Sequence, residues 1–219
     1  MRVSVKAVIG VWVVVAGAAG VLARQGEAPN LKDPSTMIVD CPPKYNAKFD
    51  TSQGEFVIEV QRDWAPRGAI RFYNLVKNGY YTENRFFRAL PNAMMQFGIT
   101  GDPALNAIWR GARIIDDVRK QTNERGYVSF ASGGPNSRTT QIFINLKDNT
   151  PLDQLGFVPF GRVTSGMNAL EKVYTGYGDI PPNGKGPDQM KIQVEGNAYL
   201  LKDFPKLDYI KTATIVEGK

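Results

Sequence analysis

The segment RFFRALPNAMMQFG, residues 85–98, holds the side chains best suited to chemistry, because it places an arginine and a glutamine among aromatic and thioether groups. If each half forms a strand, alternation puts Arg88 on the same face as Phe86, and Gln96 on the same face as Met94. A buried guanidinium is costly unless it is hydrogen-bonded, and the Gln96 carbonyl oxygen can accept such a bond. Two interpretations stay open: a functional arginine, or a structural one at a barrel rim paired with a carboxylate.

Two further segments extend this pattern. In YVSFASGGPNSRTTQIFINL, residues 127–146, two β-rich runs flank a Gly-Gly-Pro-Asn turn, and the second run carries Gln141 and Phe143 on one face. The third segment, LDQLGFVPFGRV, supplies Leu152 and Phe157 after another loop. The three segments therefore bring polar and apolar side chains to neighbouring strands.

Together these segments resemble the cyclophilin family of peptidyl-prolyl cis-trans isomerases, from about Ala47 to Val173 and again at the last strand. We interpret the chain as a bacterial-like, exported member. The resemblance implies an all-β dominated fold, a closed eight-stranded antiparallel β-barrel capped by two helices. It also implies an enzyme that accelerates rotation about Xaa-Pro bonds in proline-containing polypeptides.

The resemblance also implies which residues form the site. Arg88 stands where the family keeps its catalytic arginine, and Gln96 stands where a glutamine holds that arginine. The predicted substrate-binding positions, in the proline pocket and the groove beside it, are Met94, Phe143, Leu152, Phe157, Ala131, Ser132, Gln141 and Ala93. At the Ser132 position the family uses backbone groups to hold the substrate as an added strand.

Three positions depart from the family pattern. Ala93 replaces a pocket phenylalanine, Phe87 replaces the histidine before the catalytic arginine, and Phe157 replaces a pocket histidine. Phe157 could refill the space that Ala93 leaves open. The alternative to an active isomerase is therefore a proline-peptide-binding or chaperone-like module with weak or lost activity.

The chemistry must work without a histidine, and Cys41 is the only cysteine, which excludes Ser-His, Cys-His and His-based metal sites. A secreted hydrolase would lack a base for Ser129 or Ser132. Rotation of a prolyl bond breaks no bond, although its barrier is roughly 18–20 kcal/mol. A guanidinium aimed at the prolyl nitrogen bonds the twisted transition state better than either planar state, and that difference is what accelerates a step. We expect no metal and no cofactor.

The elements that must position these residues are mostly strands. We predict strands near 46–51, 55–62, 85–90, 93–99, 127–131, 140–146, 156–163 and 210–217. One helix is predicted from Pro66 to Asn78, beginning near Asp63 and ending before Gly79, and a second runs from Ser165 through Val173. These match the two helices that plug the barrel ends in cyclophilins.

Residues 175–208 form an added segment before the last strand. Its portion 189–202 is consistent with a short helix, although Gly196 weakens that prediction. The glycine-rich stretch GYGDIPPNGKGP, residues 176–187, lacks the spacing of either phosphate-binding pattern. We assign this segment no chemistry and expect it to pack over a barrel opening.

The N-terminus has the pattern of an export signal. Arg2 and Lys6 precede an uncharged run over residues 7–23 that ends in Val-Leu-Ala. We predict a signal peptide over residues 1–23, with an uncleaved membrane anchor as the alternative. A flexible lead-in over 24–44 precedes one isomerase domain over 45–219. The folded part is expected outside the cytoplasm, as a periplasmic or secreted protein.

The charge pattern gives little support to a nucleic-acid partner. The formal charge is 27 minus 21, or +6, and removing Arg2 and Lys6 leaves +4, with no run of more than two adjacent basic residues. These charges fit a solvated surface. We expect a monomer with no nucleic-acid partner and no membrane contact beyond the possible N-terminal anchor.

Overall fold

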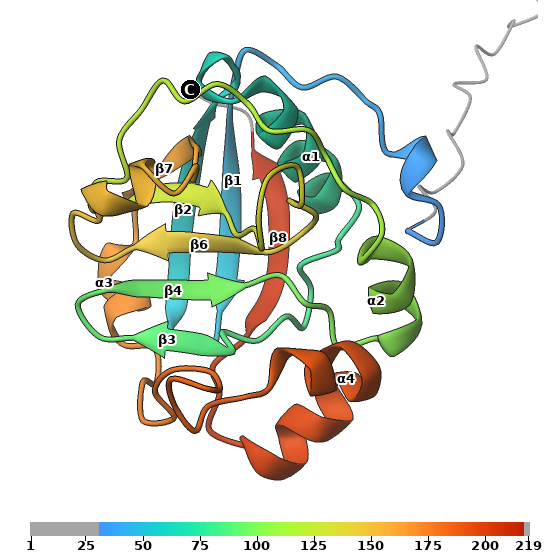
Figure 1. The fold of residues 1–219 in the computed structure, drawn as a ribbon, viewed down its shortest axis with the longest axis vertical. Coiled ribbons are helices and arrows are strands. Elements are labelled where there is room, and N and C mark those ends of the chain that lie inside the picture. The colour runs from blue at the N-terminus through green and yellow to red at the C-terminus, as the bar shows by residue number, and fades with distance from the viewer. Residues whose placement is uncertain (1–30, 217–219) are drawn as a thin grey trace, which may run out of the picture.

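The computed structural model describes residues 31–216, in which eight strands form one antiparallel sheet (Figure 1). The spatial order is β3-β4-β6-β5-β7-β2-β1-β8. The bounds are β1 Lys44–Thr51, β2 Gly54–Gln61, β3 Arg88–Leu90, β4 Met94–Phe97, β5 Tyr127–Phe130, β6 Ile142–Asn145, β7 Pro159–Ser165 and β8 Ile210–Val216. The predicted eight-stranded, all-β dominated architecture is confirmed.

The prediction of a closed barrel is wrong, because no ladder joins the two end strands β3 and β8. A single isolated bridge, Arg85 to Tyr209, links the chain before β3 to the chain before β8. Glu83 has a φ of +59°, so the backbone there turns and cannot continue as an extended strand. The sheet is therefore a curled half-barrel.

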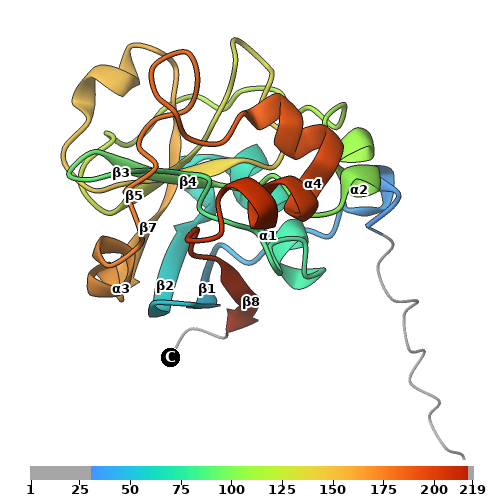
Figure 2. The ribbon, with the colours of Figure 1, turned by 90° about the horizontal axis from the view of Figure 1, so that it is seen from below.

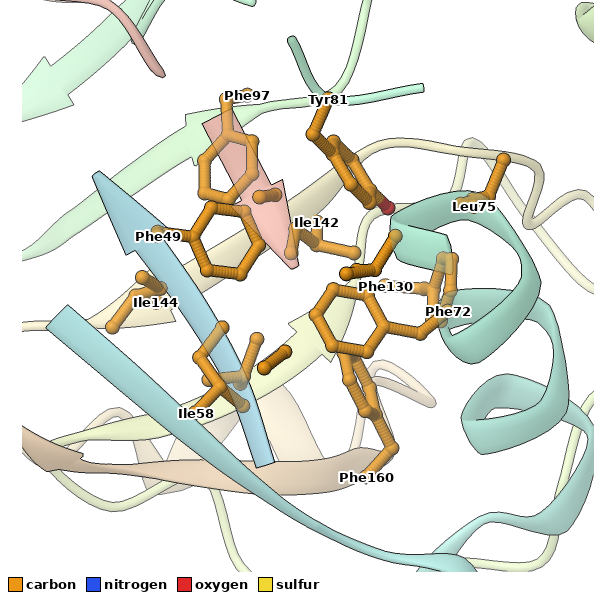
Figure 3. Close-up of a cluster of buried hydrophobic side chains, with 14 of the residues drawn as sticks. Phe49, Ile58, Phe72, Leu75, Tyr81, Phe97, Phe130, Ile142, Ile144 and Phe160 are labelled. Carbon is orange, nitrogen blue, oxygen red and sulfur yellow. The ribbon is translucent and has the colours of Figure 1, made fainter. Parts of the chain in front are cut away.

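The core lies inside the curl and is rich in aromatic rings (Figure 3). Phe49 of β1 stacks on Phe56 of β2 with ring centroids 4.7 Å apart, and Phe97 of β4 meets Phe49 edge-on. Helix α1, Pro66–Lys77, lays Phe72 and Leu75 against these rings. Alternation along the strands sends the neighbouring side chains to the outer face, where the site lies.

Helix α1 is close to its predicted bounds, although Asp63 does not begin it. Asp63 lies in the short 3₁₀ turn η2, Arg62–Trp64, and Pro66 takes the first helical position, where a missing N–H costs nothing. The carboxylate of Asp117 instead accepts the N–H groups of Arg67 at 3.0 Å and Gly68 at 2.9 Å. A distant segment thus caps the helix.

The other helices differ more from the expectation. α3, Met167–Glu171, ends before Val173, and α2, Pro103–Trp109, forms where no helix was predicted. α4, Gln189–Asp203, is the helix expected in the added segment. It bends at Gly196, whose φ is +59° and where a Cβ would collide with the carbonyl oxygen of Gly101.

The added segment lies next to the β3 edge of the sheet (Figures 1 and 2). A second apolar cluster joins it to residues that flank the β3–β4 hairpin. Phe87, directly before β3, is 1% exposed and packs in this cluster, whereas the adjacent Phe86 belongs to the main core. The full set of buried members is Phe87, Ile99, Ile192, Tyr199, Leu200 and Leu207. The position at which the resemblance implies a histidine is therefore occupied here by a ring that packs against the added segment.

The chain before β1 also packs on the body. The indole N–H of Trp109 donates to the Leu31 carbonyl at 2.8 Å, and Asn74 of α1 both accepts from and donates to the backbone of Val39. The predicted signal segment, residues 1–23, lies outside the described residues. Among residues 31–216, no helix is long and apolar enough to cross a bilayer.

Replacing Asp117 by alanine should destabilise the fold strongly. The buried Arg138 guanidinium lies 3.0 Å from the Asp117 carboxylate. In the variant the Arg138 charge would lose its most buried partner, and two N–H groups of α1 would lose their acceptor. Breaking a buried pair from one side costs about 3–5 kcal/mol. Equilibrium unfolding in guanidinium chloride should show this loss in the free energy of unfolding. Asp116→Ala, which removes a more exposed partner of Arg138, is the control and should cost less. Equal losses would contradict this account.

Candidate active site

Three neighbouring strands place the predicted polar residues on one face. In the β3–β4 hairpin, Arg88 pairs with Gln96 and Leu90 pairs with Met94, and Gln96 in turn pairs with Phe143 of β6. This register follows from a tight turn at 91–93, in which Asn92 adopts a φ of +53°. Residues from separate segments thereby meet beside one another.

These residues border a cavity of about 420 Å³. Nine of the ten predicted site residues line it: Arg88, Gln96, Met94, Phe143, Leu152, Phe157, Ala131, Ser132 and Gln141. The sequence did not point to the other lining residues, which are Gly133, Ser137, Thr139, Asn149 and Gln189. Most of these lie in loops, where no periodic pattern signals a shared face, and Gln189 begins α4 in the added segment.

Ala93 is the predicted site residue that does not line the cavity. It ends the hairpin turn, and a methyl side chain is too short to reach the space that a phenylalanine ring would fill. Its carbonyl oxygen accepts from the Leu146 N–H at 3.0 Å and from the Asn149 amide at 2.9 Å. The backbone of Ala93 thus anchors the loop that carries Leu152.

A chain of side-chain hydrogen bonds fixes the polar side of the cavity. Arg88 Nη1 donates to Gln96 Oε1 at 3.3 Å, and Gln96 Nε2 donates to Gln141 Oε1 at 2.9 Å. Arg88 also donates to both carboxylate oxygens of Asp179, from Nε at 2.6 Å and from Nη2 at 3.2 Å. The glutamine contact and a carboxylate partner, which the sequence left as alternatives, therefore coexist.

The partners of the Asp179 carboxylate lower its pKa. Partial burial alone would raise its pKa, but the hydrogen bond from Arg88, the N–H of Ile180 and the Arg88 charge lower the pKa below its ordinary value. Sequence reasoning missed this residue. Its partner is 91 positions earlier, and Asp179 lies in a glycine-rich stretch without strand or helix periodicity.

The apolar side of the cavity is formed by rings and a thioether. Phe157 meets Phe143 edge-on, with centroids 5.4 Å apart and an interplanar angle of 85°. Behind it, buried Asn123 donates to the Phe157 carbonyl at 3.0 Å and to Asp153 at 2.7 Å, and accepts from Ser129 at 2.8 Å. This polar network holds the loop that presents Leu152 and Phe157.

The arrangement offers a fixed cationic donor beside an apolar pocket. Cys41 does not line the cavity, and burial raises the pKa of its thiol, which keeps it a poor nucleophile. The chemistry that remains is binding and hydrogen bonding.

The family model described as cyclophilin type peptidyl-prolyl cis-trans isomerase/CLD matches residues 46–194. The chain belongs to this family. Among curated relatives, "Peptidyl-prolyl cis-trans isomerase-like 1" of Aspergillus oryzae is 34% identical over 153 residues, covering 66% of this chain and 89% of the relative. A Rhizopus delemar relative of the same name is 37% identical over 128 residues, covering 57% and 77%. The protein is therefore a peptidyl-prolyl cis-trans isomerase.

The solved structures agree on the fold. A cyclophilin type isomerase of Cryptosporidium parvum gives a TM-score of 0.58 at 21% identity, over 80% of this chain and 99% of that one. A second structure of that protein, determined in the presence of the dipeptide Ala-Pro, gives 0.57. The two curated relatives, from Aspergillus oryzae and Rhizopus delemar, are fungal, which gives no support to the expected bacterial-like origin.

Replacing Phe157 by alanine should weaken binding of proline-containing peptides by up to about 2 kcal/mol, because the pocket loses a ring wall. Peptide titration by calorimetry measures this loss. Leu155→Ala, in the same loop with a 69% exposed side chain, is the matched control and should bind normally. Unchanged affinity in Phe157→Ala would remove this residue from the binding site.

Proposed function

We propose that this cyclophilin accelerates Xaa-Pro rotation by non-covalent transition-state stabilisation from Arg88. The observation that carries the proposal is the position of its guanidinium, which lines the cavity while Gln96 holds Nη1. The Arg88 side chain is only 25% exposed, so it is largely shielded from water. An oriented donor needs no reorganisation during the reaction.

The cavity supports this role by gripping one side of the bond. Met94, Phe143 and Phe157 give an apolar wall against which a pyrrolidine ring can pack. With the ring held, the acyl side rotates against it. As the amide loses planarity the prolyl nitrogen recovers its lone pair, and Arg88 can donate to it. Arginine suits this task because it stays charged and its planar fork bonds substrate and support together.

Replacing Arg88 by alanine should lower kcat/KM by about 100-fold or more, with a much smaller effect on the melting temperature. Exchange NMR on an Xaa-Pro peptide measures the rate. Arg88→Lys, which keeps the charge without the fork, should remain impaired. Arg162→Ala, on β7 with a side chain 50% exposed, is the control and should retain full activity. A folded Arg88→Ala protein with unchanged activity would refute the mechanism.

We further propose that the clients are exported proteins, whose slow prolyl steps otherwise take tens of seconds or longer. The support is the N-terminal pattern, a basic start followed by the uncharged run 7–23. Mass spectrometry of the protein from fractionated cells should find an extracytoplasmic chain beginning near Arg24. An extracytoplasmic chain that retains residues 1–23 would indicate the anchor instead. A full-length cytoplasmic protein would contradict the proposal.

A further inference from the structure

The added segment 175–208 reaches the active site as well as the β3 edge of the sheet. Gln189 lines the main cavity, and Asp179 holds the guanidinium of Arg88 through both carboxylate oxygens. This is the strongest kind of side-chain ion pair, because the planar fork of the arginine matches the carboxylate. The segment therefore fixes the orientation of the residue on which the proposed chemistry depends.

The loop around Asp179 is built to hold this residue. The Ile180 N–H donates to its carboxylate at 2.7 Å, and the Gly186 N–H donates to its carbonyl at 2.8 Å. A Cβ at Gly184 would collide with that same carbonyl oxygen, and one at Gly186 would lie 2.9 Å from it. The glycines of this stretch thus permit a close backbone approach that keeps Asp179 in place.

Side chains on either side of Asp179 anchor the loop. Tyr177 and Ile180 both pack against the second apolar cluster, which contains Phe87, the residue directly before Arg88. The ion pair and the packing therefore connect the same two segments at two points. Asp179 has little freedom to leave the guanidinium.

Asp179 does not occupy the substrate space, because it is not among the residues that line the cavity. A guanidinium has five N–H donors. Asp179 engages one on Nε and one on Nη2, and Gln96 engages one on Nη1. Further donors of Arg88 stay available to a substrate, so the carboxylate supports the arginine from behind without blocking it.

We propose that Asp179 is a positioning residue for the isomerisation, holding the Arg88 guanidinium in the orientation that meets the twisted prolyl bond. The proposal rests on the catalytic role proposed above for Arg88. It gives the glycine-rich stretch 176–187 a function that its sequence pattern did not reveal. Since the contact serves the transition state, its loss acts on kcat more than on KM.

The test compares Asp179→Ala with Asp179→Asn in the full chain, using exchange NMR on one Xaa-Pro peptide. Asp179→Ala should lower kcat by about tenfold or more, as expected when a reacting group loses its alignment, with KM little changed. Asp179→Asn keeps one acceptor oxygen and should recover part of the rate. Asp203→Ala, which removes an exposed carboxylate from the same segment, is the matched control and should be fully active.

A double-mutant cycle with Arg88→Ala separates this inference from the proposed function. Asp179→Ala should have no further effect on kcat in the Arg88→Ala background, because the carboxylate acts only through the guanidinium. If Arg88→Ala is inactive but Asp179→Ala is as active as the unmodified protein, or more active, the positioning role is refuted and the function stands. If Arg88→Ala is fully active, the catalytic mechanism itself fails.

Two measurements distinguish positioning from damage to the fold. The Arg88 Nε–H resonance should shift and exchange faster with water in Asp179→Ala, while melting temperatures of Asp179→Ala and Asp203→Ala stay similar. Gly184→Ala, which displaces the Asp179 backbone, should reproduce the kcat loss. An unchanged Nε–H resonance in Asp179→Ala would overturn the proposal.

Discussion

The site depends on how one partly buried cation is held. The guanidinium of Arg88 is satisfied on one side by Gln96, on the adjacent strand, and on the other by Asp179, from a distant loop. Removing a cation from water is affordable only with such partners. The hairpin register, the Gln141 contact and the packing of the added segment all serve this arrangement.

A second constraint comes from polar groups behind the apolar wall. Asn123 and Asn145 are fully buried, and their amides link β5 and β6 to the loop carrying Phe157. Each buried amide needs its partners, so the loop has few alternative positions. The pocket wall is thus set by hydrogen bonds on one side and by ring contacts on the other.

Strand periodicity made most of the strands predictable, whereas the ten site residues followed from the family resemblance, and nine of them line the cavity. Alternation does separate Gln96 and Phe143 from core positions, but it fails at Arg88, because Phe86, expected on the same face, lies in the main core. The open edge between β3 and β8 was not predictable, since it depends on one backbone turn at Glu83. Asp179 was not identified from the sequence for a different reason. Its position is set by glycines and by packing against Phe87, contacts that no local pattern records.

The order of strands has a consequence for how the protein is made. β1 lies between β2 and β8, so within residues 31–216 the first strand to be synthesised is completed by the last. Contacts that span most of the sequence form slowly, and a nascent chain lacking β8 leaves one edge of β1 unpaired. An enzyme of prolyl isomerisation thus reaches its own working form only after its last strand has been synthesised, and before that point its exposed edge is open to association with other chains.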